Sequence, residues 1–211
     1  MTSSDRAKIS GYYSNLIATY GMDPRACDYG RAQSQQIKFQ VLSQRIKPGQ
    51  RVLDVGCGFA NYADFLESRG LGITYTGIDI CPDMIQRARQ ARPGLELEVA
   101  SPFDIDGQWD VVSANGIFYL LQEAPWETMR RLIGRMFELA GVCCVFNSLS
   151  TWAPETRDGE FQANPEEVLA YCQSLTPYVE LDHAYMPHDF CMTLRREAKP
   201  SGAARDRDDS N

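Results

Sequence analysis

Two acids and two glycines carry the strongest chemical signal in this 211-residue chain. Asp54 ends a short apolar run and stands just before Gly56 and Gly58, after which a helical pattern begins at once. Glycine lets the backbone turn sharply and lets a ligand approach the main chain, and a helix start presents N–H groups and a positive dipole end. Asp79 ends the next strand-like run. The pattern therefore indicates a ligand site with one carboxylate at the end of each of two strands.

The acid before the first glycine separates two classes of ligand. A dinucleotide-binding turn requires G-x-G-x-x-G, and its third glycine would fall at position 61, which is Asn61. A carboxylate at Asp54 is unfavourable for a pyrophosphate and favourable for a cationic amine, whereas Asp79 can accept from both hydroxyl groups of a ribose. These chemistries favour S-adenosylmethionine (SAM), a nucleoside that carries an ammonium and a sulfonium.

The two stretches also resemble a known family. Residues 52–60, Val-Leu-Asp-Val-Gly-Cys-Gly-Phe-Ala, resemble the V-L-D-x-G-C-G-x-G motif of class I SAM-dependent methyltransferases, with Ala60 in place of the last glycine. Residues 76–85, Thr-Gly-Ile-Asp-Ile-Cys-Pro-Asp-Met-Ile, resemble the family's G-x-D-x-S-x-x-M-I stretch. A turn that only packs is the alternative interpretation of the first motif. The resemblance, to the small bacterial type, covers residues 12–196.

The resemblance implies the residues that contact SAM. Asp54 would hold the methionine ammonium and Asp79 the ribose. Residues 30–39 resemble a G-S-x-x-S-Q-x-x-R-F stretch of some small bacterial methyltransferases, with Lys38 in place of arginine, although a solvated helix face is an equal alternative. The other expected cofactor contacts are Tyr13, Gln35, Lys38, Gly56, Cys57, Gly58, Ile80, Met84, Ser101, Phe103, Asn115 and Gly116.

Methyl transfer from a sulfonium is a direct displacement, so a general base is needed only where the acceptor must lose a proton early. His188 lies in the expected turn between the last two strands and is the first candidate base, with Tyr119 as the second. A hydrogen-bonded turn residue is the alternative role for His188. His183 falls within a strand pattern and is expected to be structural.

Aromatic and loop residues indicate the kind of acceptor. The selecting groups are expected to be Phe118, Tyr119, Asn147, Tyr185 and a loop over 148–163 that contains Trp152 and Phe161. Such groups suit a small, partly apolar molecule. The N-P-P-Y signature of nucleobase and glutamine methylation is absent, since Ala-Asn-Gly-Ile stands at 114–117. The predicted function is methyl transfer from SAM to a small-molecule oxygen or nitrogen. The alternatives are an inactive SAM-binding sensor or partner subunit, and an enzyme with a protein or peptide acceptor.

Composition limits the partners. A net charge of −7 and the lack of basic runs disfavour a nucleic-acid substrate. We find no signal region and no apolar run of membrane-spanning length, so no membrane partner is expected. Seven scattered cysteines lack zinc-ligand spacing, which predicts no metal site and favours a reducing cytoplasm. The oligomeric state has no signal in the sequence.

Strand-like and helix-like segments alternate after residue 50, which predicts an α/β fold. The family fold implied is a doubly wound, mostly parallel seven-stranded sheet with an antiparallel last strand and an N-terminal helical lid. The expected organisation is a lid over 1–48, a SAM-binding core over 49–196 and a disordered tail over 197–211. Strands are expected at 51–55, 74–79, 95–100, 109–114, 142–147, 178–183 and 189–196, and helices at 60–69, 82–91, 125–140 and 164–175.

Overall fold

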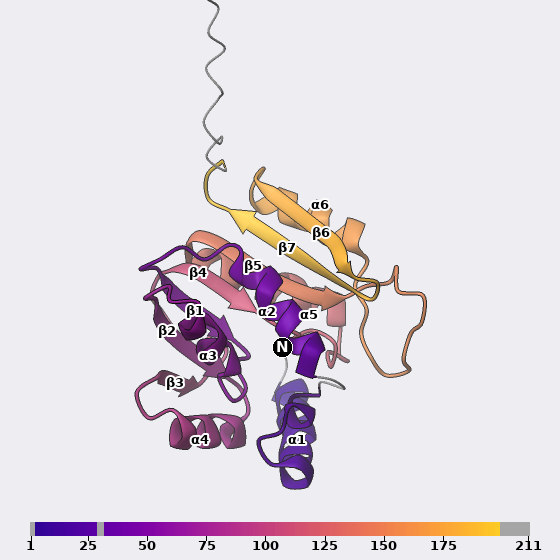
Figure 1. Ribbon diagram of the computed structural model, residues 1–211. Coiled ribbons are helices and arrows are strands. Elements are labelled where there is room, and N and C mark those ends of the chain that lie inside the picture. The colour runs from indigo at the N-terminus through magenta and orange to yellow at the C-terminus, as the bar shows by residue number, and fades with distance from the viewer. Residues whose placement is uncertain (1–2, 29–31, 199–211) are drawn as a thin grey trace, which may run out of the picture.

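A single seven-stranded sheet forms the centre of the computed structural model, which describes residues 3–28 and 32–198 (Figure 1). The strand order is β3-β2-β1-β4-β5-β7-β6, and β7 runs antiparallel to both of its neighbours. This confirms the doubly wound sheet expected from the sequence. Residues 199–211 of the expected tail, and Gly30 and Arg31 of the lid motif, lie outside the described residues. The strands are β1 (Arg51–Val55), β2 (Thr74–Asp79), β3 (Glu96–Val99), β4 (Trp109–Ala114), β5 (Ala140–Leu149), β6 (Val179–Met186) and β7 (Asp189–Arg195).

Strand β5 is longer than its sequence pattern predicted. Gly141 was expected to end the preceding helix and Asn147 to end the strand, but β5 spans Ala140–Leu149. Its partner explains the difference, because β7 pairs with β5 from Cys143 through Leu149. Ser148 is polar but only 2% exposed, since the antiparallel neighbour covers it. Tertiary pairing therefore overrides the local polarity that ended the predicted strand.

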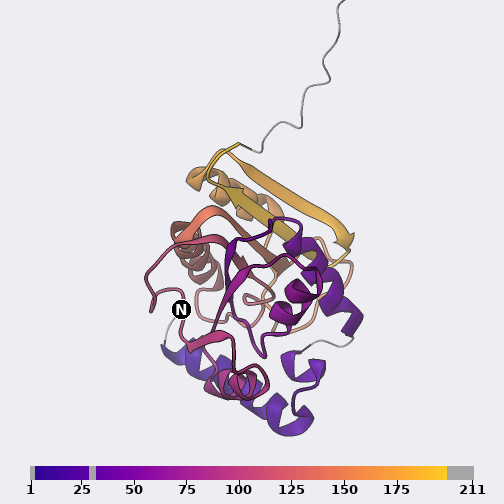
Figure 2. The same ribbon diagram turned by 60° about the vertical axis from the view of Figure 1, so that its left-hand side comes forward.

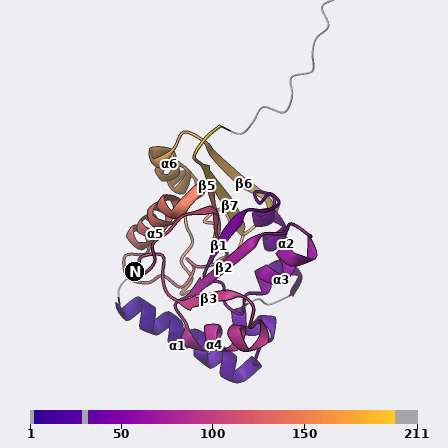
Figure 3. The same ribbon diagram turned by 90° about the vertical axis from the view of Figure 1, so that its left-hand side faces the viewer.

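Helices cover both faces of the sheet. Helices α2 (Ala32–Ser43), α3 (Asn61–Ser68) and α4 (Pro82–Ala91) contribute to the hydrophobic cluster on one face, and α5 (Pro125–Leu139) and α6 (Pro165–Leu175) to that on the other. Figure 3 shows α2 and α3 on one side and α5 and α6 on the other. Proline occupies the first turn of three of these helices, where its missing N–H costs nothing.

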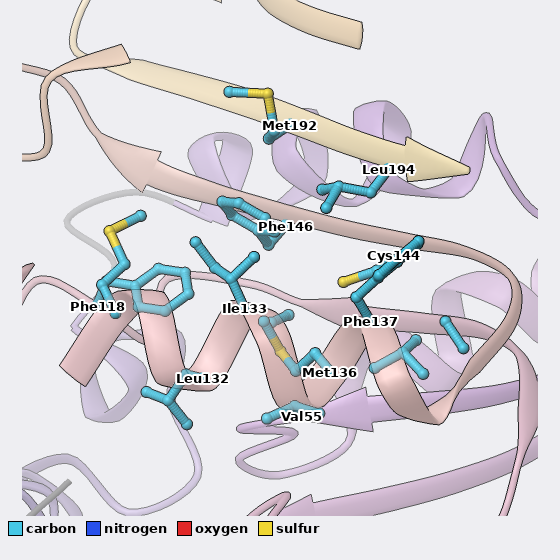
Figure 4. Packing of buried hydrophobic residues seen from close by; sticks show 14 of the residues in the cluster. Val55, Phe118, Leu132, Ile133, Met136, Phe137, Cys144, Phe146, Met192 and Leu194 are labelled. Atoms are coloured by element: carbon cyan, nitrogen blue, oxygen red, sulfur yellow. The ribbon is translucent and has the colours of Figure 1, made fainter. Parts of the chain in front are cut away.

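Helix α5 supplies the largest apolar stripe of the core. Met129, Leu132, Ile133, Met136 and Phe137 recur at helical spacing and are all buried, as the sequence predicted. They pack against buried side chains of the central and C-terminal strands, as Figure 4 shows: Val55, Cys144, Phe146, Met192 and Leu194. This packing holds β4 and β5 in place, and the candidate site lies at the carboxyl ends of the strands. Across the described ranges, none of the helices combines the length and hydrophobicity needed to cross a bilayer.

The N-terminal helix α1 (Ser3–Tyr20) lies beside α4, below the sheet (Figure 2). The Ser14 hydroxyl donates to Asp83 at 2.6 Å, and the Ser10 hydroxyl donates to the carbonyl oxygen of Ile80 at 3.0 Å. A short 3-10 helix, η1 (Pro24–Cys27), follows. These contacts hold α1 across the end of β2, where the cofactor was expected.

Candidate active site

A cavity of about 750 Å³ opens at the carboxyl ends of the strands. β1 lies between β2 and β4 and is parallel to both, so strand order reverses at this point. Open α/β sheets bind ligands at such a reversal. All but one of the expected cofactor contacts and both candidate bases line the cavity: Tyr13, Gln35, Lys38, Asp54, Gly56, Cys57, Gly58, Asp79, Ile80, Met84, Ser101, Asn115, Gly116, Tyr119 and His188. The exception is Phe103.

The turn after β1 requires its glycines. Gly56 and Gly58 have φ angles of 73° and 54°, in the left-handed region that side chains disfavour. A Cβ added to Gly56 would lie 2.4 Å from the Cγ2 atom of Ile117. The backbone N–H groups of Gly56 and Cys57 both donate to the Ile78 carbonyl oxygen, at 2.8 and 3.0 Å. The turn is therefore tied to β2, and there is no room for a side chain at Gly56.

Ala60 replaces the last glycine of the family motif without entering the cavity. Its φ is 60°, a conformation that costs an alanine about 1–2 kcal/mol. Its methyl group is fully buried in the hydrophobic cluster under α2, α3 and α4, and Ala60 does not line the cavity. The substitution therefore strains the backbone locally but leaves room for a ligand.

Asp54 is a buried carboxylate at the base of the cavity. It is 3% exposed, and the Tyr75 hydroxyl donates to its Oδ2 atom at 2.6 Å. Burial raises the pKa of Asp54 to about 7, an effect that the Tyr75 hydrogen bond opposes. A cation in the cavity would stabilise the ionised form and lower this pKa. The carboxylate is thus suited to binding an ammonium group.

Asp79 both fixes the glycine turn and faces the cavity. Its Oδ1 atom accepts from the Cys81 N–H at 2.8 Å, and its Oδ2 atom accepts from the Gly58 N–H at 2.9 Å. Burial raises the pKa of Asp79, whereas these backbone donors lower it. Asp83, in the first turn of α4, accepts from the Ser14 hydroxyl, and the cap residue Cys81 makes no side-chain cap bond. Each oxygen of Asp79 retains acceptor capacity for a second donor.

Asn147 holds the segment after β4 in place. Its Oδ1 atom accepts from the Gly116 N–H at 2.7 Å, and its Nδ2 atom donates to Asn115 Oδ1 at 2.9 Å. Asn147 is 1% exposed and does not line the cavity. The sequence analysis expected it to select the acceptor. Its contacts instead position Asn115 and Gly116, which do line the cavity.

A cluster of three tyrosines and one acid joins α1 to the β4–α5 segment. The hydroxyls of Tyr119 and Tyr12 donate to Asp28 Oδ2 at 2.8 and 2.9 Å, and those of Tyr13 and Tyr119 are 2.9 Å apart. Burial, assisted by Tyr13 and Asp28, raises the pKa of Tyr119 far above its ordinary value. Its hydroxyl therefore stays protonated and acts as a donor, which argues against the sequence-based choice of Tyr119 as a base.

A buried ion pair closes the opposite wall. The Lys38 Nζ atom lies 2.7 Å from Asp189 Oδ2, with the two side chains 10% and 1% exposed. Tyr185 also donates to Asp189. Lys38, expected at the methionine end, is thus joined to β7. His188 lies in the β6–β7 turn, as expected, and is exposed at the cavity rim.

Several aromatic residues lie away from the cavity. Phe103 is 42% exposed and faces the guanidinium of Arg131 at 5.5 Å, so it is no wall for an adenine. Trp152 packs 5.1 Å from the His183 ring, and His183 is hydrogen-bonded to Ser150 at 2.8 Å. Phe161 packs against the α5 cluster. The loop lines the cavity instead with Pro154, Glu155, Thr156, Arg157, Glu160 and Gln162.

Sequence reasoning missed Asp28, Asp189 and Tyr62. Asp28 ends η1 with a φ of 58°, a position that no sequence motif marks. Tyr62 looked like an ordinary core residue of α3, yet it lines the cavity. Its buried hydroxyl has no hydrogen-bond partner among the described residues.

The Ser101 side chain is engaged within its own loop. Its hydroxyl and its N–H both donate to Asp104 Oδ2 at 2.9 Å. These bonds and Arg6 lower the pKa of Asp104 to about 2, with the Ser101 N–H as the largest cause. Ser101 lines the cavity, but its hydroxyl hydrogen points to Asp104. An adenine contact there would use the backbone or the serine oxygen.

Comparison with known proteins agrees with this geometry. A family model described as "Methyltransferase domain" matches residues 28–174. The Mycobacterium tuberculosis protein Rv1506c, which is named as a methyltransferase, is 28% identical over 153 residues, covering 68% of this chain and 91% of that protein. Cyclopropane-fatty-acyl-phospholipid synthase of Escherichia coli is 25% identical over 113 residues, but these cover only 29% of that longer protein.

A solved structure shows the same fold. Magnesium protoporphyrin IX methyltransferase from Synechocystis, with bound SAM, has a TM-score of 0.67 and 17% sequence identity, covering 92% of this chain and 97% of that chain. The family match spans more than half of this chain, and the sheet order, the glycine turn and the cavity agree with it. The chain therefore belongs to the class I SAM-dependent methyltransferase family.

Proposed function

We propose that this enzyme transfers a methyl group from SAM to a small-molecule acceptor, at nitrogen or oxygen. The observation that carries the proposal is the buried Asp54, whose pKa is raised by burial to about 7 and which lines the cavity together with Asp79. A buried carboxylate at Asp54 beside the half-buried Asp79 favours a ligand that is both cationic and hydroxyl-bearing. SAM supplies both kinds of group, and its methyl group is already activated on sulfur.

Residues at the ends of different strands bind different parts of the cofactor. Asp54 binds the methionine ammonium, and Asp79 accepts from the ribose hydroxyls with the lone pairs not used by backbone donors. Ile80 and Met84 pack against the adenine, and Ser101 lies at its edge. Gly56, Cys57 and Gly58 allow close approach of the main chain. Burial raises the pKa of the Cys57 thiol well above its ordinary value, so it packs and is no nucleophile.

Residues 1–48 form the lid and residues 49–196 the catalytic core in this proposal. Tyr13 of α1 and Gln35 and Lys38 of α2 line the cavity from the lid side. Lys38 neutralises Asp189 and remains within reach of a ligand carboxylate at the same wall. Asn115 and Gly116, held by Asn147, direct oxygen atoms toward the partial positive charge of the methyl donor.

A small acceptor agrees with several features. The cavity is enclosed on the lid side and extends to the 150–164 loop. The net charge of −7 disfavours nucleic acid. The Synechocystis structural relative is named for a porphyrin substrate, a small molecule. We place the enzyme in the cytoplasm, because all seven of its cysteines are free thiols and a reducing compartment suits them.

Turnover of labelled SAM tests the proposal. The protein is incubated with methyl-labelled SAM and a bacterial metabolite extract, and S-adenosylhomocysteine and labelled product are quantified. Release of both in stoichiometric amounts is the expected result. Tight SAM binding without turnover in any extract would instead favour the inactive sensor or partner subunit. Label on a macromolecule would favour a protein or peptide acceptor.

Replacing Asp79 with alanine is expected to weaken SAM binding by about 1–2 kcal/mol, because charge-assisted bonds to the ribose are lost. Calorimetric titration with SAM measures the change. Glu98→Ala is the matched control, since Glu98 is an exposed acid of the neighbouring strand β3 and does not line the cavity. Equal affinities of the Asp79→Ala variant and the wild type would remove the ribose assignment.

Replacing His188 with alanine is expected to lower turnover about tenfold while leaving SAM affinity nearly unchanged, because an exposed rim imidazole assists proton loss without contacting the cofactor. His183→Gln is the control, because His183 is bonded to Ser150 and does not line the cavity. Turnover that stays undiminished at every pH would make His188 a structural turn residue.

A further inference from the structure

The cavity carries more acids than bases. Six carboxyl side chains and two basic side chains other than histidine line it within the described residues: Asp28, Asp54, Asp79, Glu155, Glu160 and Asp189, against Lys38 and Arg157. The proposed function uses Asp54 and Asp79 for the cofactor. Four acids remain for the acceptor half of the cavity.

Both bases already face an acid of the same wall. Lys38 lies 2.7 Å from Asp189, and Arg157 lies 3.8 Å from Glu160. Over residues 3–28 and 32–198, neither Asp28 nor Glu155 takes part in an ion pair. The acceptor half therefore keeps a net negative charge after its own ion pairs are counted.

The hydroxyl groups around Asp28 present acceptors to a ligand. A phenol has one hydrogen to donate, and those of Tyr12 and Tyr119 both go to Asp28. The contact between Tyr13 and Tyr119 must therefore use the hydrogen of Tyr13. All three hydrogens are used inside the cluster, and only oxygen lone pairs remain. A ligand that meets this wall has to bring the donors.

The 150–164 loop adds negative charge beside the same cluster. The Phe161 N–H donates to the Tyr119 carbonyl oxygen at 2.8 Å, which holds the loop against Tyr119. The pKa of Tyr12 is raised to about 12, first by burial and then by Asp28, and the charge of Glu160 adds to the effect. Glu160 and Asp28 therefore act on the same region.

We propose that the methyl acceptor is an amine that arrives as a cation, with Asp28 as its anchor. This inference rests on the proposed function and narrows its acceptor. An ammonium group brings both the positive charge and the hydrogen-bond donors that the wall lacks. A carboxylate would be repelled here, and a neutral alcohol would gain only one hydrogen bond.

Beside His188 at the rim, the same cluster offers a second route for the proton that must leave before nitrogen can react. The ammonium proton passes to the Tyr13 oxygen, while the Tyr13 proton moves to Tyr119 and the Tyr119 proton moves to Asp28. The nitrogen lone pair then forms the bond to the methyl carbon as the carbon–sulfur bond breaks, and that electron pair stays on sulfur. Asp28 is exposed and returns its proton to water. The products are a methylated ammonium ion, S-adenosylhomocysteine and one proton.

Ion-exchange separation of the extract tests the proposal. The bacterial metabolite extract is separated at neutral pH into three fractions. One contains the cations held by a cation exchanger (the cation-retained fraction), one contains the anions held by an anion exchanger, and one is held by neither. Each fraction is incubated with labelled SAM. We expect the label in the cation-retained fraction and on nitrogen. Acceptor activity in either of the other fractions overturns the amine assignment but leaves the methyltransferase function intact. Failure of every fraction to accept label removes the proposed function, and the inference with it.

Variants test the role of Asp28. Asp28→Asn is expected to lower kcat/KM at least tenfold on the cation-retained fraction, mainly through KM, and to reduce its dependence on salt. Calorimetric affinity for S-adenosylhomocysteine should not change. Asp158→Asn is the control, since Asp158 is an exposed acid of the 150–164 loop that does not line the cavity.

A second pair of variants separates the anchor from the fold. Tyr20→Phe changes a tyrosine of the same helix as Tyr13 that is exposed and does not line the cavity, and it should retain turnover. If Asp28→Asn does not fold, Glu155→Gln removes the other acid without an ion pair and should raise KM for the same fraction. Wild-type kinetics in the folded Asp28→Asn variant, or in Glu155→Gln where that variant replaces it, would overturn the proposal.

Discussion

Replacing Asp54 with asparagine is expected to weaken SAM binding by about 3 kcal/mol, roughly a hundredfold, because the carboxylate that we propose binds the methionine ammonium is lost. The same change should stabilise the ligand-free fold. Asp54 is 3% exposed, so its ionised form is poorly solvated. Asparagine preserves the size and can still accept from Tyr75. Binding and stability should therefore move in opposite directions.

The pH dependence follows from the sign of the shift. Burial raises the folded-state pKa of Asp54 from 3.8 to about 7, so the folded protein holds a proton that the unfolded chain has released between about pH 4 and 7. Stability of the ligand-free protein should fall as pH rises through this window, by up to about 4 kcal/mol. SAM needs the ionised form, so its affinity should rise with pH up to about 7 and then level off.

Chemical denaturation and calorimetry at a series of pH values measure both effects. Asp54→Asn should lose the pH dependence of stability and of affinity in this window. Tyr75→Phe is the matched control, because it keeps the acid and removes a donor that lowers its pKa. That variant should move the midpoint of SAM affinity to higher pH. An affinity for SAM that is flat from pH 5.5 to 8 in the wild type contradicts the ammonium assignment.

The sequence predicted correctly those helices and strands whose ends are marked by residues within the element or next to it. β2, α4 and β4 have the predicted bounds, because proline, glycine and β-branched residues act within a few positions. The predicted start of the helix at 164 also agrees with the structure, because the Asn164 side chain caps α6 by accepting from the Glu166 N–H at 2.9 Å. β5 was predicted too short because its last residues depend on β7, a partner that the local pattern does not contain.

The candidate site divides in the same way. Asp54, Gly56 and Gly58 belong to one contiguous motif, and the structure brings them together at the cavity. Trp152 and Phe161 were expected at the acceptor because aromatic loop residues often bind ligands, yet both pack on neighbouring side chains. Asp28 meets Tyr119 across 91 positions of sequence, and only the folded lid reveals that contact.

Replacing Gly56 with alanine is expected to destabilise the fold by about 2–4 kcal/mol and to remove measurable SAM binding. The residue has a φ of 73°, and the new Cβ would lie 2.4 Å from Ile117 Cγ2. Either the β1–α3 turn or Ile117 must move, and both line the cavity. The change therefore disturbs the cofactor site directly as well as the fold.

Gly116→Ala separates the cost of backbone strain from the cost of steric overlap. Gly116 has a φ of 67° and lines the same cavity, but a Cβ added there would meet nothing within 4 Å. Gly116→Ala should therefore lower the free energy of unfolding only by the cost of a left-handed backbone conformation for alanine, about 1–2 kcal/mol. Thermal or chemical unfolding of both variants measures the difference. If the Gly56→Ala and Gly116→Ala variants are equally stable, the close contact with Ile117 does not contribute to the loss of stability.

A double mutant tests whether the steric overlap is with Ile117. Ile117→Ala removes the Cγ2 atom that the new methyl group would meet. Combined with Gly56→Ala, it should restore about 1–3 kcal/mol relative to the sum of the single changes, because the overlap is relieved while the backbone strain remains. SAM affinity should recover in part for the same reason. Strictly additive effects would show that the turn requires glycine for its conformation alone, since relief of a steric overlap necessarily makes the two substitutions interdependent.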